Sequence, residues 1–314
     1  MKVAFLDVVH PVLKEGLEAR GVECVDFTLT PLNQITHEIS EFQGLVVRSR
    51  FPIDAEFLEK CKSLEFIARS GAGMENIDIS YCEANGISLF NAPEGNRNAV
   101  AEHALGMLLS LFNNLHTANE EVKSGKWDRE GNRGVELDGR SVGIIGFGNN
   151  GSAFARKLRG FEVQVLAYDK YKSGFGDDFV TEASLEDIFE CCDIVSLHIP
   201  QNHETVGMVD AEFIRMMANP FYLINLSRGK IVETKALLDG LKEEKVLGAC
   251  LDVLEFEKAS FENMFEGDLN QTFTELLNSD QVILSPHVGG WTRESYFKLS
   301  KVLLDKIIAH YKWS

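Results

Sequence analysis

Three polar residues in the second half of the sequence could together carry out acid–base chemistry. Arg228, Glu257 and His287 each follow closely after an apolar stretch of strand type. An arginine stays charged and binds a carboxylate through paired hydrogen bonds, whereas a histidine titrates near neutral pH and can exchange a proton with a hydroxyl group. A neighbouring glutamate favours the protonated imidazole. Because ligands collect at the carboxyl ends of parallel strands, these residues predict one catalytic site.

A glycine motif provides a second candidate site, for a dinucleotide. Gly146, Gly148 and Gly151 form a GxGxxG string. The string alone is weak evidence, but here it follows apolar residues 142–145 and precedes a helical stretch with an apolar side. The first glycine permits a tight turn, the second lets the backbone approach a pyrophosphate, and the third allows close packing of helix on strand. The helix N-terminus would then hold the anion.

Asp169 lies where the next strand should end. It can accept hydrogen bonds from both hydroxyls of the adenosine ribose, and its charge would repel a 2′-phosphate. This position favours NAD over NADP, although the adjacent Lys170 could weaken that preference. The alternative interpretation is a glycine-rich turn followed by an aspartate that only ends a strand.

Composition limits the class of protein. The chain has 314 residues, of which 45% are hydrophobic, and this is enough for two domains with sizeable cores. Its formal net charge of −17 would repel nucleic acid, whereas a few arginines in a cleft could still bind a small anionic substrate. We therefore expect no nucleic-acid partner.

The cysteines and the N-terminal residues bear on the cellular compartment. Six cysteines lie mainly in apolar stretches without metal-ligand spacing, so we expect reduced core thiols and no metal site. A strand begins at the N-terminus without a signal peptide, and no apolar run reaches the roughly 20 residues of a membrane span. We expect a cytoplasmic protein without membrane contact.

Strands alternate with amphipathic helical stretches along most of the chain, which predicts an α/β fold with parallel sheets. We expect five strands in a first unit and six in a second. The first five are at residues 3–6, 22–27, 45–47, 66–68 and 87–90, with a helix at 55–61, and the next six are at 141–146, 163–168, 193–198, 221–225, 247–252 and 282–284.

Two further helices should connect these units. A long, mostly apolar helix at 98–115 is expected to be buried between layers or subunits and to act as a hinge. A helix at 292–310 should return to the first unit. The predicted domains are therefore 1–96 with 291–314, and 97–290. The polar and acidic residues 261–277 are expected to form a surface excursion, within a segment (259–280) whose role the sequence does not show.

At this point the sequence resembles the D-isomer-specific 2-hydroxyacid dehydrogenases and, within them, the phosphoglycerate dehydrogenases. The resemblance spans nearly the whole chain and implies a Rossmann NAD-binding domain and a flavodoxin-like substrate-binding domain, both doubly wound. Besides the glycine motif it depends on Arg48-Ser-Arg50, Gly71-Ala-Gly73, Asn76-Ile-Asp78, Asn91-Ala-Pro, Ala99-Val-Ala-Glu102, Asn225-Leu-Ser-Arg228-Gly, Leu251-Asp-Val and Ser285-Pro-His287-Val-Gly-Gly290.

The resemblance implies a role for each catalytic candidate. Arg228 would orient the 2-oxo acid, His287 would be the acid and base, and Glu257 would pair with His287. In oxidation, His287 would take the hydroxyl proton while a hydride leaves C2 for the nicotinamide. The family's other implied contacts are backbone amides at Ala72 and Gly73 for the substrate carboxylate and Asp252 for the nicotinamide carboxamide.

The remaining candidates line the same two sites. Arg48 and Arg50 follow a strand end in the first unit and could receive a phosphate or another distal part of the substrate. Asn96 is a further substrate-binding candidate. The remaining cofactor-binding candidates are Asn149, Asn150, His198, Pro200, Thr205, Leu226, Ser227 and Gly289.

Three residues depart from the family pattern. Glu233 stands where an aspartate is common, and we expect little effect. Lys258 replaces the proline that usually follows the catalytic glutamate, which would leave the loop carrying Glu257 more mobile. Arg97 replaces a serine and could add positive charge near the cleft or join a subunit interface.

The sequence leaves several functions open. The main hypothesis is NAD-dependent oxidation of 3-phosphoglycerate, a step of serine biosynthesis, and the first alternative is reduction of glyoxylate or hydroxypyruvate. An NAD-sensing, corepressor-like binding protein is a further alternative, whereas formate dehydrogenases carry a glutamine in place of Glu257. The apolar helix 99–115 and Trp127 suggest a homodimer. Because the chain ends at Ser314, we expect no C-terminal regulatory extension and no serine feedback through one.

Overall fold

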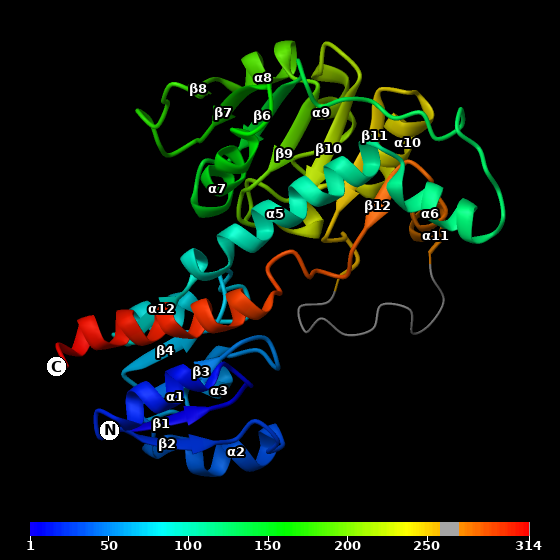
Figure 1. Cartoon of the computed structure of the whole chain (residues 1–314). Coiled ribbons are helices and arrows are strands. Elements are labelled where there is room, and N and C mark those ends of the chain that lie inside the picture. Colours follow the sequence, from blue (N-terminus) through cyan, green and yellow to red (C-terminus); the bar gives the residue numbers. More distant parts are fainter. Residues whose placement is uncertain (258–269, 314) are drawn as a thin grey trace. The chain divides into compact units, whose positions relative to one another are not determined.

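The structure is a computed structural model that describes residues 1–257 and 270–313. These residues form two compact units (Figure 1). Unit 1 comprises residues 1–97 and 291–313, and unit 2 comprises residues 98–257 and 270–290. Both are α/β units with parallel sheets, which confirms the predicted fold class.

Unit 1 contains a five-stranded parallel sheet in the order β2-β1-β3-β4-β5. All five predicted strands are present, and each begins and ends within one residue of its predicted bounds. In the register of the sheet, Ala4 of β1 lies opposite Leu45 of β3. The strands are β1 (Lys2–Phe5), β2 (Glu23–Asp26), β3 (Gly44–Val47), β4 (Phe66–Arg69) and β5 (Ser88–Asn91).

Helices cover both faces of this sheet because successive side chains of each strand point to opposite faces. Val3 and Phe5 pack with α1 and α12, while Ala4 packs in the cluster of α2, α3 and α4. The helical segments are α1 (Pro11–Glu18), α2 (Leu32–Glu38), η1 (Ile39–Glu41), α3 (Ala55–Leu58), α4 (Ile79–Ala84) and α12 (Arg293–Tyr311).

The last helix, α12, belongs to unit 1. Thr292 caps it by accepting a hydrogen bond from the backbone N–H of Ser295, and the Ser295 hydroxyl accepts one from the Thr292 N–H. Leu299 and Leu303 of α12 are buried in one cluster with Leu13 and Leu17 of α1. The final helix therefore completes the core that the first helix begins.

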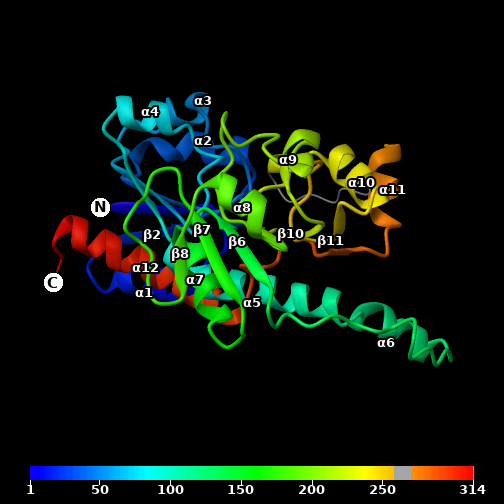
Figure 2. The ribbon, with the colours of Figure 1, turned by 90° about the horizontal axis from the view of Figure 1, so that it is seen from above.

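Unit 2 contains seven parallel strands in the order β12-β11-β10-β9-β6-β7-β8 (Figure 1), and Figure 2 shows β6, β7, β8, β10 and β11 from above. Six were predicted, and β8 was missed because only Val180 of its three residues is buried. The strands are β6 (Ser141–Ile145), β7 (Gln164–Tyr168), β8 (Val180–Glu182), β9 (Ile194–Leu197), β10 (Phe221–Asn225), β11 (Val246–Leu251) and β12 (Val282–Leu284).

Helices also cover both faces of this second sheet, with one apolar cluster on each side. Phe154 of α7 is fully buried in one cluster, and Leu237 of α10 is fully buried in the other. The segments are α6 (Leu115–Lys123), α7 (Asn149–Leu158), α8 (Leu185–Cys191), α9 (Ala211–Met216), η2 (Gly229–Ile231), α10 (Thr234–Lys242) and α11 (Gln271–Leu277).

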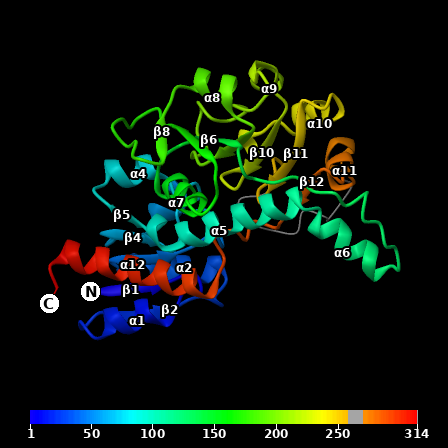
Figure 3. The same ribbon diagram turned by 45° about the horizontal axis from the view of Figure 1, so that its top comes forward.

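The long connecting helix, α5 (Pro93–Phe112), begins five residues earlier than predicted and runs from unit 1 into unit 2. It ends before Asn114, which has a left-handed φ of 50°. Figure 3 shows α5 and α6 as separate helices. One side of α5 is buried, including Ala104 and Leu108, whereas Glu102 is exposed. The predicted hinge role stays a prediction.

The acidic segment 261–277 is only partly described. Residues 258–269 lie outside the described ranges, and Lys258 is among them. The segment's last seven residues form α11, in which Phe273 and Leu276 are almost completely buried. The expectation of a surface excursion is therefore wrong for these seven residues, because two apolar side chains anchor them to the core.

Two searches of the described residues bear on other expectations. None of their helices is both long and apolar enough to cross a membrane. All six cysteines are free, and burial raises the pKa of Cys82 to about 11. Cys191 is exposed, however, so the expectation of core thiols does not hold for it.

Candidate active site

His287 and Glu257 are in direct contact. The Nδ1 atom of His287 lies 2.9 Å from Oε2 of Glu257. The other carboxylate oxygen of Glu257 accepts a hydrogen bond from the backbone N–H of Leu254 at 2.8 Å, which fixes the carboxylate at the end of β11. Nδ1 of the imidazole therefore faces Glu257, and Nε2 is the other ring nitrogen.

The backbone at His287 is unusual for a residue with a side chain. Its φ of +55° lies in the left-handed region, which costs energy for residues other than glycine. The backbone N–H of His287 donates to the carbonyl oxygen of Asp252 at 2.8 Å and to that of Ser285 at 3.0 Å. These contacts hold the peptide in a conformation that aims the imidazole at Glu257.

Asp252 is a nearly completely buried carboxylate, with 2% of its surface exposed. Its Oδ1 accepts from the Ser285 hydroxyl at 2.6 Å and from the Val288 N–H at 2.8 Å, and its Oδ2 accepts from the Gly289 N–H at 2.7 Å. A buried charge is stable only when it is paired or hydrogen-bonded. Asp252 therefore holds the loop of His287, and this role was not foreseen from the sequence.

Arg228 follows β10, the strand that pairs with β11. Its Nη1 donates to the Ser227 carbonyl at 2.6 Å, and its own carbonyl accepts from the Asn225 side chain at 3.0 Å. A Cβ added to the next residue, Gly229, would lie 1.8 Å from the Leu254 carbonyl oxygen, so the loops after β10 and β11 touch. Arg228, Glu257 and His287 thus follow three neighbouring strands at one sheet edge.

The glycine motif forms the turn between β6 and α7. Gly146 has a φ of +94°, and a Cβ there would lie 2.5 Å from the His198 carbonyl oxygen. A Cβ at Gly151 would lie 2.0 Å from the Gly146 carbonyl oxygen, which shows the close packing of helix on strand. Each of these two positions therefore requires glycine.

The residues around the start of α7 fit a dinucleotide. Around the position of a Cβ on Gly148, no heavy atom of the described chain lies within 4 Å, so a ligand can approach its backbone. Asn149 and Asn150 form the first turn of α7, where backbone N–H groups point out of the helix. The buried Oδ1 of Asn150 has no hydrogen-bond partner in residues 1–257 and 270–313. This unpaired acceptor and the open space beside Gly148 suit a bound pyrophosphate group and its ribose hydroxyls.

Asp169 lies directly after β7 and accepts three backbone hydrogen bonds. Its Oδ2 accepts from the Phe147 N–H at 2.8 Å, and its Oδ1 accepts from the N–H groups of Tyr171 and Lys172 at 3.0 and 3.1 Å. A carboxylate offers about four lone-pair sites, so it retains room for a ribose hydroxyl. Lys170 instead pairs with Glu204 at 2.6 Å, which offsets its charge.

His198, Pro200 and Thr205 lie in the loop after β9. Burial lowers the pKa of His198 to about 4, so its imidazole is neutral at pH 7. Its Nε2 lies 2.9 Å from the Ser196 hydroxyl. The Thr205 hydroxyl donates to the Pro200 carbonyl at 2.7 Å and so closes this loop.

Leu226, Ser227 and Gly289 lie around Asp252 and β9. A Cβ on Gly289 would lie 2.8 Å from Oδ2 of Asp252 and 3.1 Å from the Leu226 side chain. Ser227 is buried and donates its hydroxyl proton to the Leu197 carbonyl. These three residues therefore pack between the loops, and their role in cofactor binding stays a prediction.

In unit 1, the loops after β3 and β4 carry the predicted substrate ligands. Ala72 accepts a hydrogen bond from the Asn91 side chain at 2.7 Å, which fixes the 71–73 loop and with it Gly73. The Arg48 guanidinium stacks on the Trp291 indole, 4.2 Å from the ring centroid. Within the described residues the Arg48 guanidinium makes no hydrogen bond, so its N–H groups remain available to an anion.

Arg50 has a different environment from Arg48. Its Nη1 donates to the carbonyls of Leu6 and Phe27, at 3.3 and 3.0 Å, and its Nη2 donates to that of Thr30 at 2.8 Å. Three of its five N–H groups are therefore committed to the loops after β1 and β2. The structure gives Arg50 a role in holding the fold, which the sequence did not reveal.

The remaining sequence candidates are dispersed. Asn96 lies on α5, and its buried Oδ1 has no partner among the described residues. Glu233 precedes α10, and its backbone N–H donates to the Val209 carbonyl at 3.0 Å. Arg97 is the last residue of unit 1 before the division within α5.

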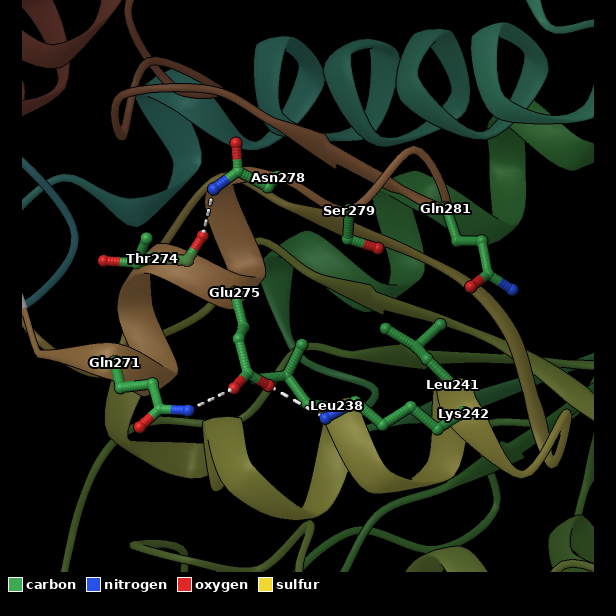
Figure 4. Close-up of a pocket in the computed structure, with 9 residues that line it drawn as sticks. All are labelled: Leu238, Leu241, Lys242, Gln271, Thr274, Glu275, Asn278, Ser279 and Gln281. Carbon is green, nitrogen blue, oxygen red and sulfur yellow. Dashed lines mark hydrogen bonds and ion pairs between the residues drawn. The ribbon is translucent and has the colours of Figure 1, made fainter.

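A surface pocket of about 440 Å³ lies between α10 and α11 (Figure 4). Seven of its nine lining residues have polar side chains, and Lys242 pairs with Glu275 across it at 2.8 Å. None of the predicted site residues lines it. Its lining comprises Leu238, Leu241, Lys242, Gln271, Thr274, Glu275, Asn278, Ser279 and Gln281.

Sequence reasoning missed two side chains next to the site, His103 of α5 and Ser285. His103 Nε2 lies 2.9 Å from the Ser285 hydroxyl. His103 directly follows the string that ends at Glu102, and Ser285 is the first residue of the Ser-Pro-His string. A polar residue on the otherwise apolar side of a long helix was the available signal.

Comparison with known proteins places this geometry in a family. A family profile described as D-isomer specific 2-hydroxyacid dehydrogenase, NAD binding domain, matches residues 105–289. The chain is 31% identical over 306 residues to D-3-phosphoglycerate dehydrogenase of Archaeoglobus fulgidus, covering 96% of this chain and 56% of that protein. It is 33% identical over 269 residues to hydroxypyruvate reductase of Thermotoga maritima, covering 86% and 85%. The chain thus spans about half the length of the first relative and most of the second.

A solved structure supports the same placement. The crystal structure of D-lactate dehydrogenase from Aquifex aeolicus, complexed with NAD and lactic acid, matches with a TM-score of 0.82 and 28% identity. The match covers 99% of this chain and 96% of that one. The chain therefore belongs to the D-isomer-specific 2-hydroxyacid dehydrogenases, and it carries the NAD-binding domain of that family.

Proposed function

We propose that the protein interconverts a small D-2-hydroxy acid and its 2-oxo acid with NAD(H). The observation that carries this proposal is the contact of 2.9 Å between His287 and Glu257 at the sheet edge that also bears Arg228. An imidazole paired to a carboxylate and a fixed guanidinium are what proton transfer next to a carboxylate requires.

The residues for the cofactor divide into three groups. Gly146, Gly148 and Gly151 with the first turn of α7 would hold the pyrophosphate, and Asp169 would receive the ribose. Asp252 has one carboxylate site left after its three hydrogen bonds, and it would receive the carboxamide. When bound, NAD supplies the acceptor for the hydride.

The protein's own contribution to the reaction is proton transfer and orientation. In oxidation, His287 Nε2 removes the proton of the substrate hydroxyl, and Glu257 accepts a hydrogen bond from Nδ1–H and stabilises the resulting imidazolium. In reduction, the same Nε2 returns a proton to the oxygen. Arg228 holds the oxygen or carboxylate of the 2-oxo acid during both directions.

The first candidate substrate is 3-phosphoglycerate. Its distal phosphate needs a cation, and the Arg48 guanidinium, which stacks on Trp291 and makes no hydrogen bond among the described residues, could supply one. Relatives named D-3-phosphoglycerate dehydrogenase, at 31% identity over nearly the whole chain, support this candidate. Serine biosynthesis would then be the metabolic setting.

The second candidate is reduction of hydroxypyruvate or glyoxylate. Arg50 is held by three backbone carbonyls, which removes one of two expected phosphate ligands, and neither of these substrates has a phosphate. Hydroxypyruvate reductase of Thermotoga maritima and glyoxylate reductase of Pyrococcus furiosus match this chain over most of their own length.

Steady-state assays can distinguish these candidates. We would compare NAD with 3-phosphoglycerate against NADH with hydroxypyruvate and with glyoxylate, using the same preparation throughout. A preference in kcat/KM identifies the substrate. Absence of turnover with all three, together with tight NADH binding, would contradict the enzyme proposal and favour an NAD-sensing binding protein.

We also propose a homodimer formed through α6 and the segment after it. Leu115, Val122 and Trp127 are exposed there, Trp127 to 79%. Such a group of large apolar side chains is typical of an interface. Light scattering after size-exclusion chromatography should give twice the chain mass, and Trp127→Glu should reduce it to one chain.

A further inference from the structure

Three side chains form a hydrogen-bonded chain beside the loop of His287. His103 Nε2 lies 2.9 Å from the Ser285 hydroxyl oxygen, which lies 2.6 Å from Oδ1 of Asp252. His103 comes from α5, Ser285 follows β12 and Asp252 follows β11. The chain therefore connects a helix to two strand ends.

The direction of the hydrogen bonds follows from the chemistry of the groups. Asp252 accepts two backbone N–H groups, and as a carboxylate it can only accept, so the single proton of Ser285 must go to Asp252. The Ser285 oxygen then accepts from His103, whose Nε2 must carry the proton.

The chain ends at the peptide of His287. Asp252 accepts from the N–H groups of Val288 and Gly289, and its carbonyl accepts from that of His287. Each of these contacts constrains the left-handed backbone that places the imidazole beside Glu257. A shift of the Asp252 carboxylate would therefore rotate the His287 peptide.

We propose that His103 is a positioning residue for His287, acting through Ser285 and Asp252. The proposal rests on the acid and base role of His287 given above. His103 Nε2 also lies 3.6 Å from Oδ1 of Asp252, so it can act on Asp252 directly as well as through Ser285, whereas the contacts with the His287 loop are made by Asp252. The effect of His103 should therefore appear in the rate of the chemical step rather than in cofactor binding.

The test compares two substitutions that differ in one donor. His103→Leu removes the N–H that Ser285 accepts, whereas His103→Gln retains an amide N–H at a similar reach. Gly106→Ala is the matched control, because Gly106 lies on the same helix and a Cβ there would meet no heavy atom of the described residues within 4 Å. We expect kcat to fall about tenfold in His103→Leu, because the loss of one hydrogen bond would disturb the position of the His287 imidazole. We expect little change in KM. His103→Gln should recover most of kcat, and Gly106→Ala should match wild type.

A second measurement does not depend on turnover. In protein labelled with ¹⁵N-histidine, the His287 imidazole signals, assigned by their loss in His287→Asn, should shift in His103→Leu and return toward wild type in His103→Gln. If wild type turns over none of the three substrates, these signals still decide the positioning role while the proposed function fails. Unchanged kcat and unchanged signals in His103→Leu, or equal losses in the Leu and Gln variants, would overturn the inference. Should His103→Leu fail to fold, Ser285→Ala breaks the same chain and is measured in the same way.

Discussion

The carboxylate of Asp169 accepts a hydrogen bond from the backbone N–H of Phe147 at 2.8 Å, which connects the end of β7 to the middle of the glycine motif. The aspartate expected to select the cofactor thus also shapes the turn that would bind the cofactor's pyrophosphate. Any substitution at Asp169 will consequently combine two effects, and its tests must separate them.

We predict that Asp169→Asn changes cofactor selectivity more than affinity. The amide oxygen can still accept from a backbone N–H, whereas the negative charge that repels a 2′-phosphate is lost. The ratio of kcat/KM with NADP to that with NAD should rise about tenfold or more. Asp169→Ala should instead raise KM for both cofactors, because the glycine turn loses its anchor. A selectivity ratio in Asp169→Asn equal to that of wild type would contradict the charge argument.

We predict that His287→Asn abolishes turnover and leaves NADH binding nearly intact. The general base is lost, which costs about 10²-fold or more in kcat, while the glycine motif and Asp169 are unchanged. Stopped-flow or steady-state rates measure the first effect, and NADH fluorescence titration measures the second. Near-normal turnover would reject the assignment of His287 as acid and base.

We predict that Arg50→Ala destabilises unit 1 rather than the binding of a phosphorylated substrate alone. Three backbone carbonyls would lose a charged donor, at a cost of about 2 kcal/mol in the free energy of unfolding. Urea unfolding measures this cost, with Arg133→Ala as the control on an exposed arginine. Arg48→Ala should leave the unfolding midpoint closer to wild type and weaken 3-phosphoglycerate more than glyoxylate. Equal effects of Arg48→Ala on both substrates would argue against a phosphate site there.

We predict that His198 makes the protein less stable in mild acid. Its folded-state pKa of about 4 lies below the ordinary value of 6.5, so between these values the unfolded chain binds the extra proton and the folded chain does not. Stability is therefore complete above about pH 6.5 and falls as the pH drops toward 4, by about 2 kcal/mol at pH 5 from this group.

The variant His198→Gln tests this pH dependence. Glutamine can still bond to the Ser196 hydroxyl but does not titrate. The difference in free energy of unfolding between pH 7 and pH 5, measured by urea unfolding, should therefore shrink in the variant. A difference as large as that of wild type would assign the acid sensitivity to other groups.

The sequence predicted the strands well because each one is an apolar run bounded by turns. It missed β8, whose buried surface is limited to Val180, and it placed the start of α5 too late because Pro93 is compatible with the first turn of a helix. The periodicity of apolar residues identifies helices and strands that bury a continuous face. Neither β8 nor the first residues of α5 has such a face.

For the candidate site, the sequence identified residue types but not what each side chain contacts. Arg48 and Arg50 are equivalent in the string Arg-Ser-Arg, yet one stacks on Trp291 and the other is held by backbone carbonyls. Their distinction depends on Phe27, Thr30 and Trp291, which are distant in sequence. His103 was overlooked for the same reason, since its partner Ser285 is far along the chain.

The packing of α12 on α1 has a consequence for biosynthesis. Unit 2 is built from residues 98–257 and 270–290, whereas unit 1 needs residues from both ends of the described chain. During translation, Leu13 and Leu17 must wait until Leu299 and Leu303 have left the ribosome before that apolar surface is covered. The first half of unit 1 would therefore be the segment most exposed to chaperones and to misassociation while the NAD-binding domain is already folding.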